Sequence, residues 1–166
     1  GDWGFQVVDI SNPELPVTEG SLSILGYAEG VAVQGSSAFV AISDQGLMAV
    51  DISSPLSPLV VGELHLGGVA QGVTVQGDLA LIAAGNRGLQ VVDIRVSASP
   101  GILDSVDTPG SAWSVTIQGD FAYIADRNEG LQIVNISGHA PIAIAGSVDT
   151  PGDAFGVAVH DDLAFV

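Results

Sequence analysis

The amino-acid sequence predicts an all-β protein built from four copies of one unit, and three observations lead to this prediction. Short segments recur with a constant spacing of 42 residues. Each copy contains four short apolar runs, which are separated by glycine, proline, serine or aspartate. No stretch has the 3.6-residue apolar spacing of an amphipathic helix, and 22 glycines and 8 prolines interrupt the chain. A stack of helices is therefore excluded.

Two sequence markers define the repeat. The first reads GFQVVDIS, GLMAVDIS, GLQVVDIR and GLQIVNIS, and its copies begin at Gly4, Gly46, Gly88 and Gly130. The second is a hairpin-like segment such as VTVQGDLALIA, and its copies begin at Val31, Val73, Val115 and Val157. A period of about 40–45 residues with four strands per unit is typical of the four-stranded antiparallel blades of a β-propeller. A β-helix, the main alternative, has much shorter coils with fewer strands.

The unit that contains Gly88 shows how the strands are arranged. We expect strands over residues 72–76, 79–83, 89–94 and 101–106. Gly77 and Asp78 form a two-residue loop of the kind that closes a tight hairpin. Gly88 precedes the third strand, where a left-handed turn favours glycine, and Gly4, Gly46 and Gly130 are its equivalents. Because the strands are apolar on both faces, we expect the sheets to be covered on both sides.

The repeat divides the chain into half a blade, three complete blades and a second half blade. We place these at residues 1–28, 29–70, 71–112, 113–154 and 155–166. The terminal halves could pair and close a four-bladed ring, or the chain could be a segment of a propeller with six to eight blades. We expect the larger propeller, because Gly1 lies inside a repeat and Val166 stops before its strand is complete.

Charge and composition exclude several classes of function. The chain has 19 acidic residues against three arginines, which gives a net charge of −16 and makes nucleic acid or an anionic lipid surface an unlikely partner. The apolar runs are too short for a membrane-spanning helix. Cysteine is absent, which excludes disulfides and thiol chemistry. The acidity fits a secreted or cell-surface protein, a high-salt environment, or simply high solubility.

One repeat position carries an aspartate or asparagine at the end of a strand. Its occupants are Asp9, Asp51, Asp93 and Asn135. Such a side chain can accept hydrogen bonds from backbone amides two residues further on, so we expect these residues to cap turns. The alternative role is that of calcium ligands, but calcium needs about six to eight converging oxygens and the chain lacks a dense acidic loop. We therefore expect no metal site.

Motifs for catalysis or cofactor binding are also lacking. His65, His139 and His160 occupy different repeat positions, and none has metal-binding spacing. The chain contains no GxSxG elbow, phosphate-binding loop or dinucleotide-binding glycine pattern. We therefore expect no catalytic residues and no cofactor.

Two sets of loops vary between copies while their surroundings stay constant. One set precedes the glycine of the first marker, and the other precedes the first strand of each blade, where Glu29, Gln71, Trp113 and Phe155 share a position. In a propeller both sets emerge on one face, around the mouth of the central channel. The residues best suited to binding on this face are Trp3, Tyr27, Arg87, Trp113 and Arg127. The alternative is that the sequence at these loop positions varies freely because no packing contact constrains it.

The segment Leu89–Ile94, the Ser/Pro loop after it and the hairpin Asp120–Asp126 resemble the LVIVD repeat family, and the resemblance covers the whole chain. Met48-Ala49 and Asn135 are small departures from the motif. The resemblance implies a β-propeller of a bacterial or archaeal cell surface, and hence an extracellular or cell-surface location. No catalytic or ligand-binding residue belongs to the motif, so none is transferred.

Two classes of function remain open. We expect a non-catalytic binding or scaffold module that uses the channel-mouth face for a protein or a glycan and also contacts the rest of its own propeller. The alternative is a hydrolase or lyase with its site in the central channel. That alternative would need acids and bases that converge from several blades, and fold alone does not decide function.

Overall fold

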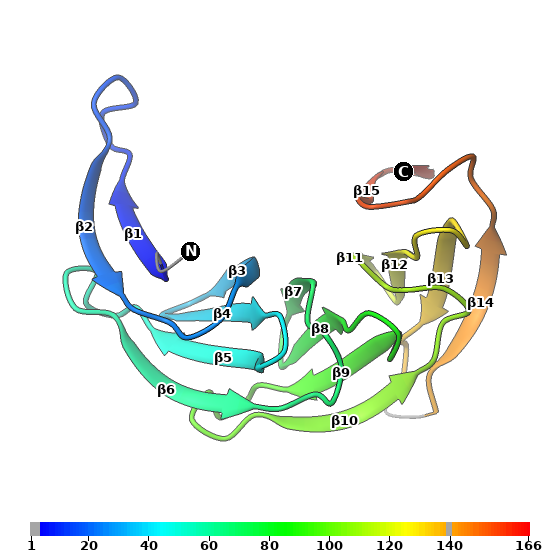
Figure 1. Cartoon of the computed structure of the whole chain (residues 1–166), viewed down its shortest axis with the longest axis horizontal. Helices are drawn as coiled ribbons and strands as arrows, with labels where there is room; N and C mark the ends of the chain where they lie inside the picture. Colours follow the sequence, from blue (N-terminus) through cyan, green and yellow to red (C-terminus); the bar gives the residue numbers. More distant parts are fainter. Residues whose placement is uncertain (1–3, 139–140) are drawn as a thin grey trace.

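The computed structural model describes residues 4–138 and 141–166, and this part of the chain contains strands, turns and loops but no helix. The strands follow one another along an open arc (Figure 1). Their bounds are β1 Phe5–Asp9, β2 Val17–Leu22, β3 Ala28–Gln34, β4 Ser37–Ile42, β5 Gly46–Asp51, β6 Leu59–Leu64, β7 Gly72–Gln76, β8 Leu79–Ala83, β9 Leu89–Asp93, β10 Gly101–Val106, β11 Ser114–Gln118, β12 Phe121–Ala125, β13 Leu131–Asn135, β14 Ala143–Val148, β15 Ala158–His160 and β16 Leu163–Phe165.

The strands form three four-stranded antiparallel sheets and two terminal hairpins. The sheets are β3–β6, β7–β10 and β11–β14, and the hairpins are β1–β2 and β15–β16. In each sheet every strand pairs with the next strand in the sequence. Strands β3, β7 and β11 lie on the inner side of the arc, whereas β6, β10 and β14 follow its outer rim (Figure 1). The predicted fold class, an all-β chain of antiparallel propeller blades, is thus confirmed.

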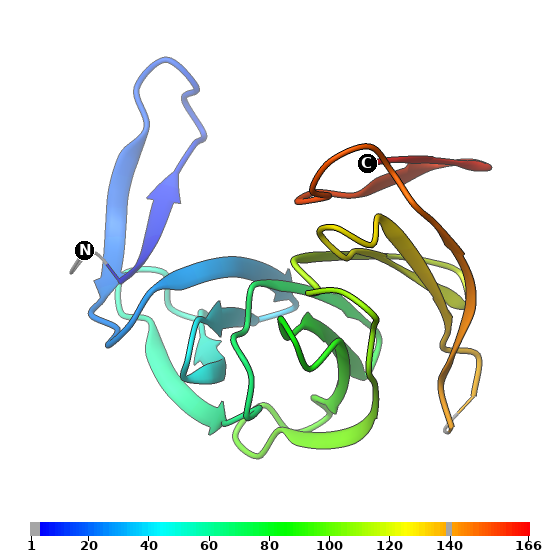
Figure 2. The same cartoon turned by 45° about the vertical axis from the view of Figure 1, so that its right-hand side comes forward.

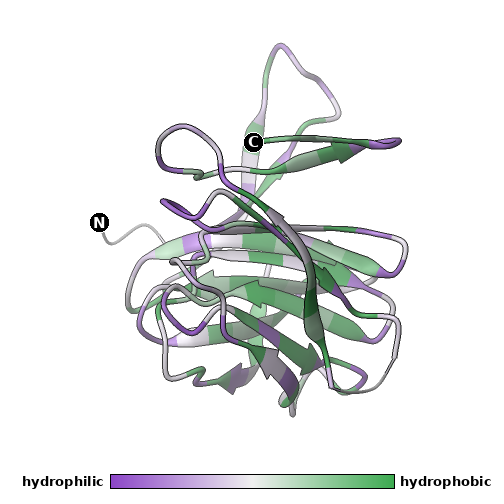
Figure 3. Ribbon diagram, turned by 90° about the vertical axis from the view of Figure 1, so that its right-hand side faces the viewer, coloured by the Kyte–Doolittle hydropathy of each residue, from purple (hydrophilic) through white to green (hydrophobic). Residues whose placement is uncertain are grey.

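The core lies between neighbouring sheets rather than within one of them. Phe39 and Leu47 of one sheet form a cluster with Ile82 and Val92 of the next. A second cluster joins Leu81 and Leu89 to Ile124 and Val134, and a third joins Val40 to Phe5 of the first hairpin. Apolar residues accordingly concentrate in the strands and hydrophilic ones in the loops (Figure 3). The middle strands of the complete blades are covered on both faces, as predicted from their apolar residues on both faces.

A series of glutamines connects each blade to the next at the hairpin end of the innermost strands. The Nε2 amide of Gln118 donates a hydrogen bond of 2.8 Å to the carbonyl of Asp161. Gln76 bonds in the same way to the carbonyl of Gly119 at 3.4 Å, and Gln34 bonds to Gly77. Because these glutamines share one repeat position, the same polar link recurs at each step along the arc.

The glycine before each third strand meets the outermost strand of its own blade at close range. Gly88 has a φ of +63°, and a Cβ atom built on it would lie 2.3 Å from the carbonyl oxygen of Val106. The same approach recurs at the equivalent positions: Gly4, Gly46 and Gly130. Both the left-handed conformation and the lack of space for a Cβ atom therefore require glycine.

The aspartates and the asparagine at the strand ends accept hydrogen bonds from the turn that follows. Asp9, Asp51 and Asn135 each accept a bond of 2.8 Å from the backbone N–H two residues ahead. Asp93 accepts a bond of 2.9 Å from the N–H of Arg95. These side-chain oxygens are engaged by backbone amides, which is the capping arrangement expected from the sequence.

We predict that Gly88→Val lowers the free energy of unfolding by about 1–3 kcal/mol, because valine adds strain at a positive φ and a clash with the Val106 carbonyl. The matched control is Gly101→Val, since a Cβ atom there meets nothing within 4 Å. Urea denaturation of both variants measures the effect. A Gly88→Val change below about 0.5 kcal/mol would show that the turn does not need glycine.

Candidate functional site

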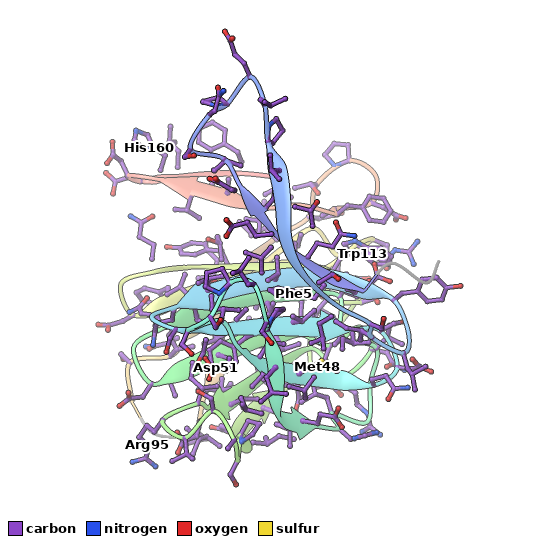
Figure 4. The ribbon with its side chains drawn as sticks, turned by 90° about the vertical axis from the view of Figure 1, so that its left-hand side faces the viewer. Phe5, Met48, Asp51, Arg95, Trp113 and His160 are labelled. Carbon is purple, nitrogen blue, oxygen red and sulfur yellow. The ribbon has the colours of Figure 1, made fainter. Side chains whose placement is uncertain are left out.

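The two variable sets of loops meet at one end of the blades. The backbone of Gly85 exchanges two hydrogen bonds of 3.0 Å with that of Ala112, which lies at the entry to the next blade. Arg127 and Ala154 form the same bridge one repeat later. Figure 4 shows Trp113 at this end of the molecule and Asp51, Arg95 and His160 at the opposite end. The loop before a third strand thus lies beside the loop that enters the following blade.

Trp113, Phe155 and Arg127 form a compact cluster at this end. The rings of Trp113 and Phe155 pack edge to face, with centroids 5.1 Å apart and planes at 82°. The guanidinium carbon of Arg127 lies 5.6 Å from the centroid of Trp113 and 5.5 Å from that of Phe155. Arg127 also donates a hydrogen bond of 2.9 Å from Nη2 to the carboxylate of Asp153. One positive charge is therefore held by two aromatic faces and one carboxylate.

Arg127 reaches this position with an unusual backbone conformation. Its φ is +48°, in the left-handed region, and the equivalent residue in the preceding blade is Gly85. A non-glycine residue in this region carries strain of about 1–3 kcal/mol and must be held by its surroundings. The bridge to Ala154 does so here, with hydrogen bonds of 3.1 and 2.9 Å. The Nε atom of Arg127 is buried and has no hydrogen-bond partner among the described residues.

The cluster stands at the edge of a cavity of about 310 Å³ on the inner side of the arc. Its walls come from the starts of β3, β7 and β11. The residues at one repeat position, Glu29, Gln71, Trp113 and Phe155, all line it. Gly30 and Gly72 in the adjoining position let the innermost strands approach closely, because a Cβ atom there would lie 3.2 Å from the backbone N of Val73 and 3.0 Å from the carbonyl oxygen of Trp113 respectively. The cavity combines aromatic, amide and carboxylate groups.

The other residues predicted for the binding face do not join this cluster. Tyr27 is 65% exposed on its loop. Arg87 is also exposed and donates a hydrogen bond of 3.3 Å from Nε to the carbonyl of Gly67. Trp3 lies outside the described residues. Of the predicted set, the structure therefore brings Trp113 and Arg127 together.

Phe155 and Asp153 complete the cluster, although the sequence prediction did not select them. Phe155 shares the repeat position of Trp113, and Asp153 varies between copies in the same loop. Comparison of copies at these positions could have identified both residues. Their contact with Arg127 could not be inferred from the sequence, because it depends on the bridge between consecutive blades.

The two histidines in the described ranges lie apart from the cluster. His65 lines a separate pocket with Glu63 and Met48. His160 is exposed, and its Nε2 atom lies 3.4 Å from a carboxylate oxygen of Asp161. His139 is not within the described residues. In residues 4–138 and 141–166, no group of three or more His, Cys, Asp or Glu residues is arranged to hold a metal ion.

Asp126, next to Arg127, is a fully buried carboxylate that sequence reasoning did not single out. It accepts a hydrogen bond of 2.6 Å from the hydroxyl of Thr108 and one of 2.8 Å from the N–H of Gly110. Burial raises the pKa of Asp126, and the two hydrogen bonds partly oppose this rise. Both bonds fix the loop that leads from β10 to Trp113.

The repeat contains a signal that could have identified this pair. Asp126 occupies the position of Ile42 in an earlier copy, and Thr108 occupies that of Ile24. Ile24 and Ile42 belong to one apolar cluster. A hydrogen-bonded polar pair has thus replaced an apolar pair at equivalent, buried positions.

With this geometry in place, comparison with known proteins identifies the family. Residues 1–23, 25–65, 67–108 and 109–150 each match the LVIVD repeat. The chain belongs to the LVIVD repeat family. The four matches are consecutive and follow the 42-residue repeat seen in the sequence. A search of curated proteins gave no match.

Solved structures similar to this LVIVD chain share its fold at low sequence identity. The computationally designed Ika8 protein has a TM-score of 0.77 and 11% identity, over 98% of this chain and 49% of its own. The designed Ika4 protein has a TM-score of 0.71 and 8% identity, and the match covers 85% of this chain and 84% of Ika4. BamB from Moraxella catarrhalis, a β-propeller, has a TM-score of 0.69 and 14% identity, and the match covers 89% of this chain and 46% of BamB. The LVIVD chain thus spans about half the length of Ika8 and of BamB. In the described ranges, no helix has the length and apolarity to cross a membrane.

We predict that Asp126 makes the protein less stable as the pH rises. Since its folded pKa is raised, the folded state holds this proton more tightly than the unfolded state does. The free energy of unfolding should therefore fall as the pH increases from the ordinary value of 3.8 through the folded pKa. Asp126→Asn keeps an oxygen for the Gly110 amide and has no such titration, so its stability relative to wild type should increase over this window.

Urea denaturation at a series of pH values tests this prediction, with Asp51→Asn as the control. The N–H of Ser53 lowers the pKa of Asp51, so its contribution has the opposite sign and is lost as the pH falls below 3.8. Relative to wild type, Asp51→Asn should lose stability as the pH rises, whereas Asp126→Asn should gain it. A pH-independent difference between wild type and Asp126→Asn would contradict the assigned role of burial.

Proposed function

We propose that this chain is a non-catalytic binding or scaffold module of a secreted or cell-surface protein, and that it binds a protein or a glycan at the mouth of the central channel. The observation that carries this proposal is the cavity with Glu29, Gln71, Trp113 and Phe155 at one repeat position. Four blades deliver four different side chains to one place on an otherwise repetitive scaffold. Loops placed on a rigid frame in this way are the usual carriers of binding function.

The side chains around the cavity indicate the chemistry of the partner. The rings of Trp113 and Phe155 offer apolar faces on which a sugar ring or an apolar side chain can pack. The carboxylates of Glu29 and Asp153 can accept hydrogen bonds from hydroxyl or amino groups. The net charge of −16 favours a neutral or cationic partner, because it would slow the approach of an anionic one.

The same groups support binding rather than hydrolysis or lyase chemistry. Among the described residues, the polar side chains on the cavity wall are Glu29, Gln71 and Ser114. Asp126 is the carboxylate whose pKa burial raises, but it is engaged by Thr108 and Gly110 and is not part of that wall. Glu29 is thus the one titratable side chain that the described residues place on that wall, and Asp153 beside it is paired with Arg127. The alternative of a channel-based enzyme, which would need converging acids and bases, therefore has less support.

We predict that Trp113→Ala weakens binding by about 1–3 kcal/mol, because it removes the largest aromatic surface at the cavity. The probes are an array of neutral and amino-bearing glycans and a set of lysine- and arginine-rich peptides. Titration calorimetry then measures the affinity of wild type and variant for each hit. The loss of the Phe155 and Arg127 contacts should also reduce stability by about 0.5–1.5 kcal/mol.

Two controls make the result interpretable. Asp120→Ala changes the hairpin on the opposite face and should leave both affinity and fold unchanged. Trp113→Phe retains an aromatic ring and should retain part of the affinity. If Trp113→Ala binds every probe as wild type does, the channel mouth is not the binding site. If it unfolds the protein in a thermal melt, Trp113 is needed for blade packing, and the affinity of Trp113→Phe then tests the site.

A further inference from the structure

A cavity of about 280 Å³ lies between hairpin β1–β2 and the blade β3–β6. These two parts of the chain stand side by side in both views of the arc (Figures 1 and 2). The floor of the cavity is apolar and includes the buried side chains of Ile24, Ile42 and Met48. Its edge carries Glu63, which is exposed on β6. The volume lies near the lower end of the range of about 300–1,000 Å³ that is usual for small-molecule sites.

The walls of this cavity belong to a formed junction between blades. A Cβ atom on Gly20 of β2 would lie 2.1 Å from the carbonyl oxygen of Pro55, which is in the loop between β5 and β6. The next junction has the same close approach, because a Cβ atom on Gly62 would lie 2.2 Å from the carbonyl oxygen of Ser97. Strand β2 is thus seated on its neighbouring blade as β6 is seated on the following one.

Two residues that line the cavity depart from the repeat. Met48 stands where the other three copies have glutamine, and Glu63 stands where they have serine. The equivalents are Gln6, Gln90 and Gln132 for Met48, and Ser21, Ser105 and Ser147 for Glu63. Two positions that are uniform in the rest of the chain are therefore altered at one cavity.

The replacement of glutamine by Met48 removes a hydrogen bond that later blades make. The Nε2 amide of Gln90 donates a bond of 3.0 Å to the carbonyl of Arg87, and the same bond recurs one blade further on. Gln45 holds the repeat position of Arg87 and lines the cavity. Methionine has no N–H group, and no other side chain in the described ranges donates a bond to the Gln45 carbonyl.

The next junction supplies a cation at the position that borders this cavity. Arg87 donates a hydrogen bond of 3.3 Å from Nε to the carbonyl of Gly67. A Cβ atom on Gly68 would lie 2.7 Å from Cγ of Arg87, so the arginine side chain packs against this link between blades. At the first junction the equivalent residues are Gln45 and Leu25. Gln45 carries no charge, and within the described part of the chain no side chain bonds to the carbonyl of Leu25.

Three hydrogen-bond acceptors at the cavity therefore lack the donors that their surroundings could supply. The carbonyl groups of Leu25 and Gln45 have lost the two donors of the next junction. The carboxylate of Glu63 adds a negative charge, and it takes no part in the ion pairs among the described residues. A ligand that fits these groups must carry several N–H donors and a positive charge. The sulfur of Met48 packs favourably against an aromatic ring.

We propose that this cavity binds a small organic cation with an apolar or aromatic body. The body packs on the floor around Met48, and an ammonium or guanidinium group binds the carboxylate of Glu63 and the carbonyls of Leu25 and Gln45. The net charge of −16 favours the approach of such a cation. The site shares no residue with the cavity at the channel mouth. The cation is either a free molecule or a side chain of a bound peptide, because both present the same groups.

Phenethylamine tests the need for a positive charge, and phenethyl alcohol is its neutral control with the same body. Wild type should bind the amine about tenfold more tightly than the alcohol, because only the amine forms charge-assisted hydrogen bonds with Glu63. Titration followed by the NMR signals of the backbone amides measures both affinities, and the largest shifts should surround Met48 and Glu63. Equal affinity for the two compounds, or binding of neither, would overturn the proposal.

Two substitutions restore the residues of the other copies and should weaken binding while the blade stays folded. Met48→Gln places an amide where Gln90 has one, so that it should fill the cavity and bond to the carbonyl of Gln45. Glu63→Ser removes the carboxylate. Each variant should bind phenethylamine about tenfold more weakly, with a melting temperature no lower than that of wild type. Glu14→Ser removes one charge from the loop of the first hairpin, outside the cavity, and should bind as wild type does.

Unchanged binding of the amine by both Met48→Gln and Glu63→Ser would overturn the proposal. A peptide of alternating arginine and phenylalanine that displaces the amine from wild type would support a side chain as the occupant, whereas failure to displace it would support a free molecule. Trp113→Ala should bind the amine as wild type does. If Trp113→Ala alone abolishes this binding, the cation binds at the channel mouth, so that the present proposal fails and the proposed function does not.

Discussion

The middle strands of each blade are apolar on both faces, and they stay dry only if a neighbouring blade covers each face. Phe39, Leu81 and Ile124 are at most 2% exposed because side chains of the adjacent sheet surround them. Burial of a large apolar side chain contributes about 1.5–3 kcal/mol to the free energy of unfolding. An isolated blade would expose these side chains and lose most of this contribution. The arc, the glutamine links between blades and the backbone bridges at the opposite end of the blades are all consequences of this need for stacking.

Stacking also constrains the two ends of the blades differently. At the hairpin end, glutamines that link one blade to the next require a similar turn in every copy, which leaves little room for variation. At the other end only a backbone bridge is required, and side chains there are free to differ. Arg127 illustrates this freedom, because it replaces Gly85 in a left-handed conformation and gains contacts to Trp113 and Phe155. The cavity beside it combines residues from several blades, which no single repeat could assemble.

The fold could be predicted from the sequence because the residues that mark its turns and strand ends recur in every copy. Gly88 and its equivalents marked the tight turn, the aspartates marked the strand ends, and the loops that vary between copies marked one face. The partners of particular side chains could not be predicted in the same way. Arg127 contacts Asp153 and Phe155 across a bridge between blades, and that bridge is formed by backbone atoms. The Thr108–Asp126 pair could have been identified from the sequence, since it replaces an apolar pair at the same repeat positions.

The glutamine links have one more consequence, which concerns how such a chain can change its size. Gln34, Gln76 and Gln118 each bond to a carbonyl in the turn of the following blade, and that turn lies at the same place in every copy. At this link, the glutamine that one blade presents forward therefore matches the turn that any other blade presents backward. Duplication or deletion of one whole unit would create no new kind of junction, whereas a change of a few residues would misalign every bond at that junction. As far as this link is concerned, a change of length in whole units leaves every junction intact.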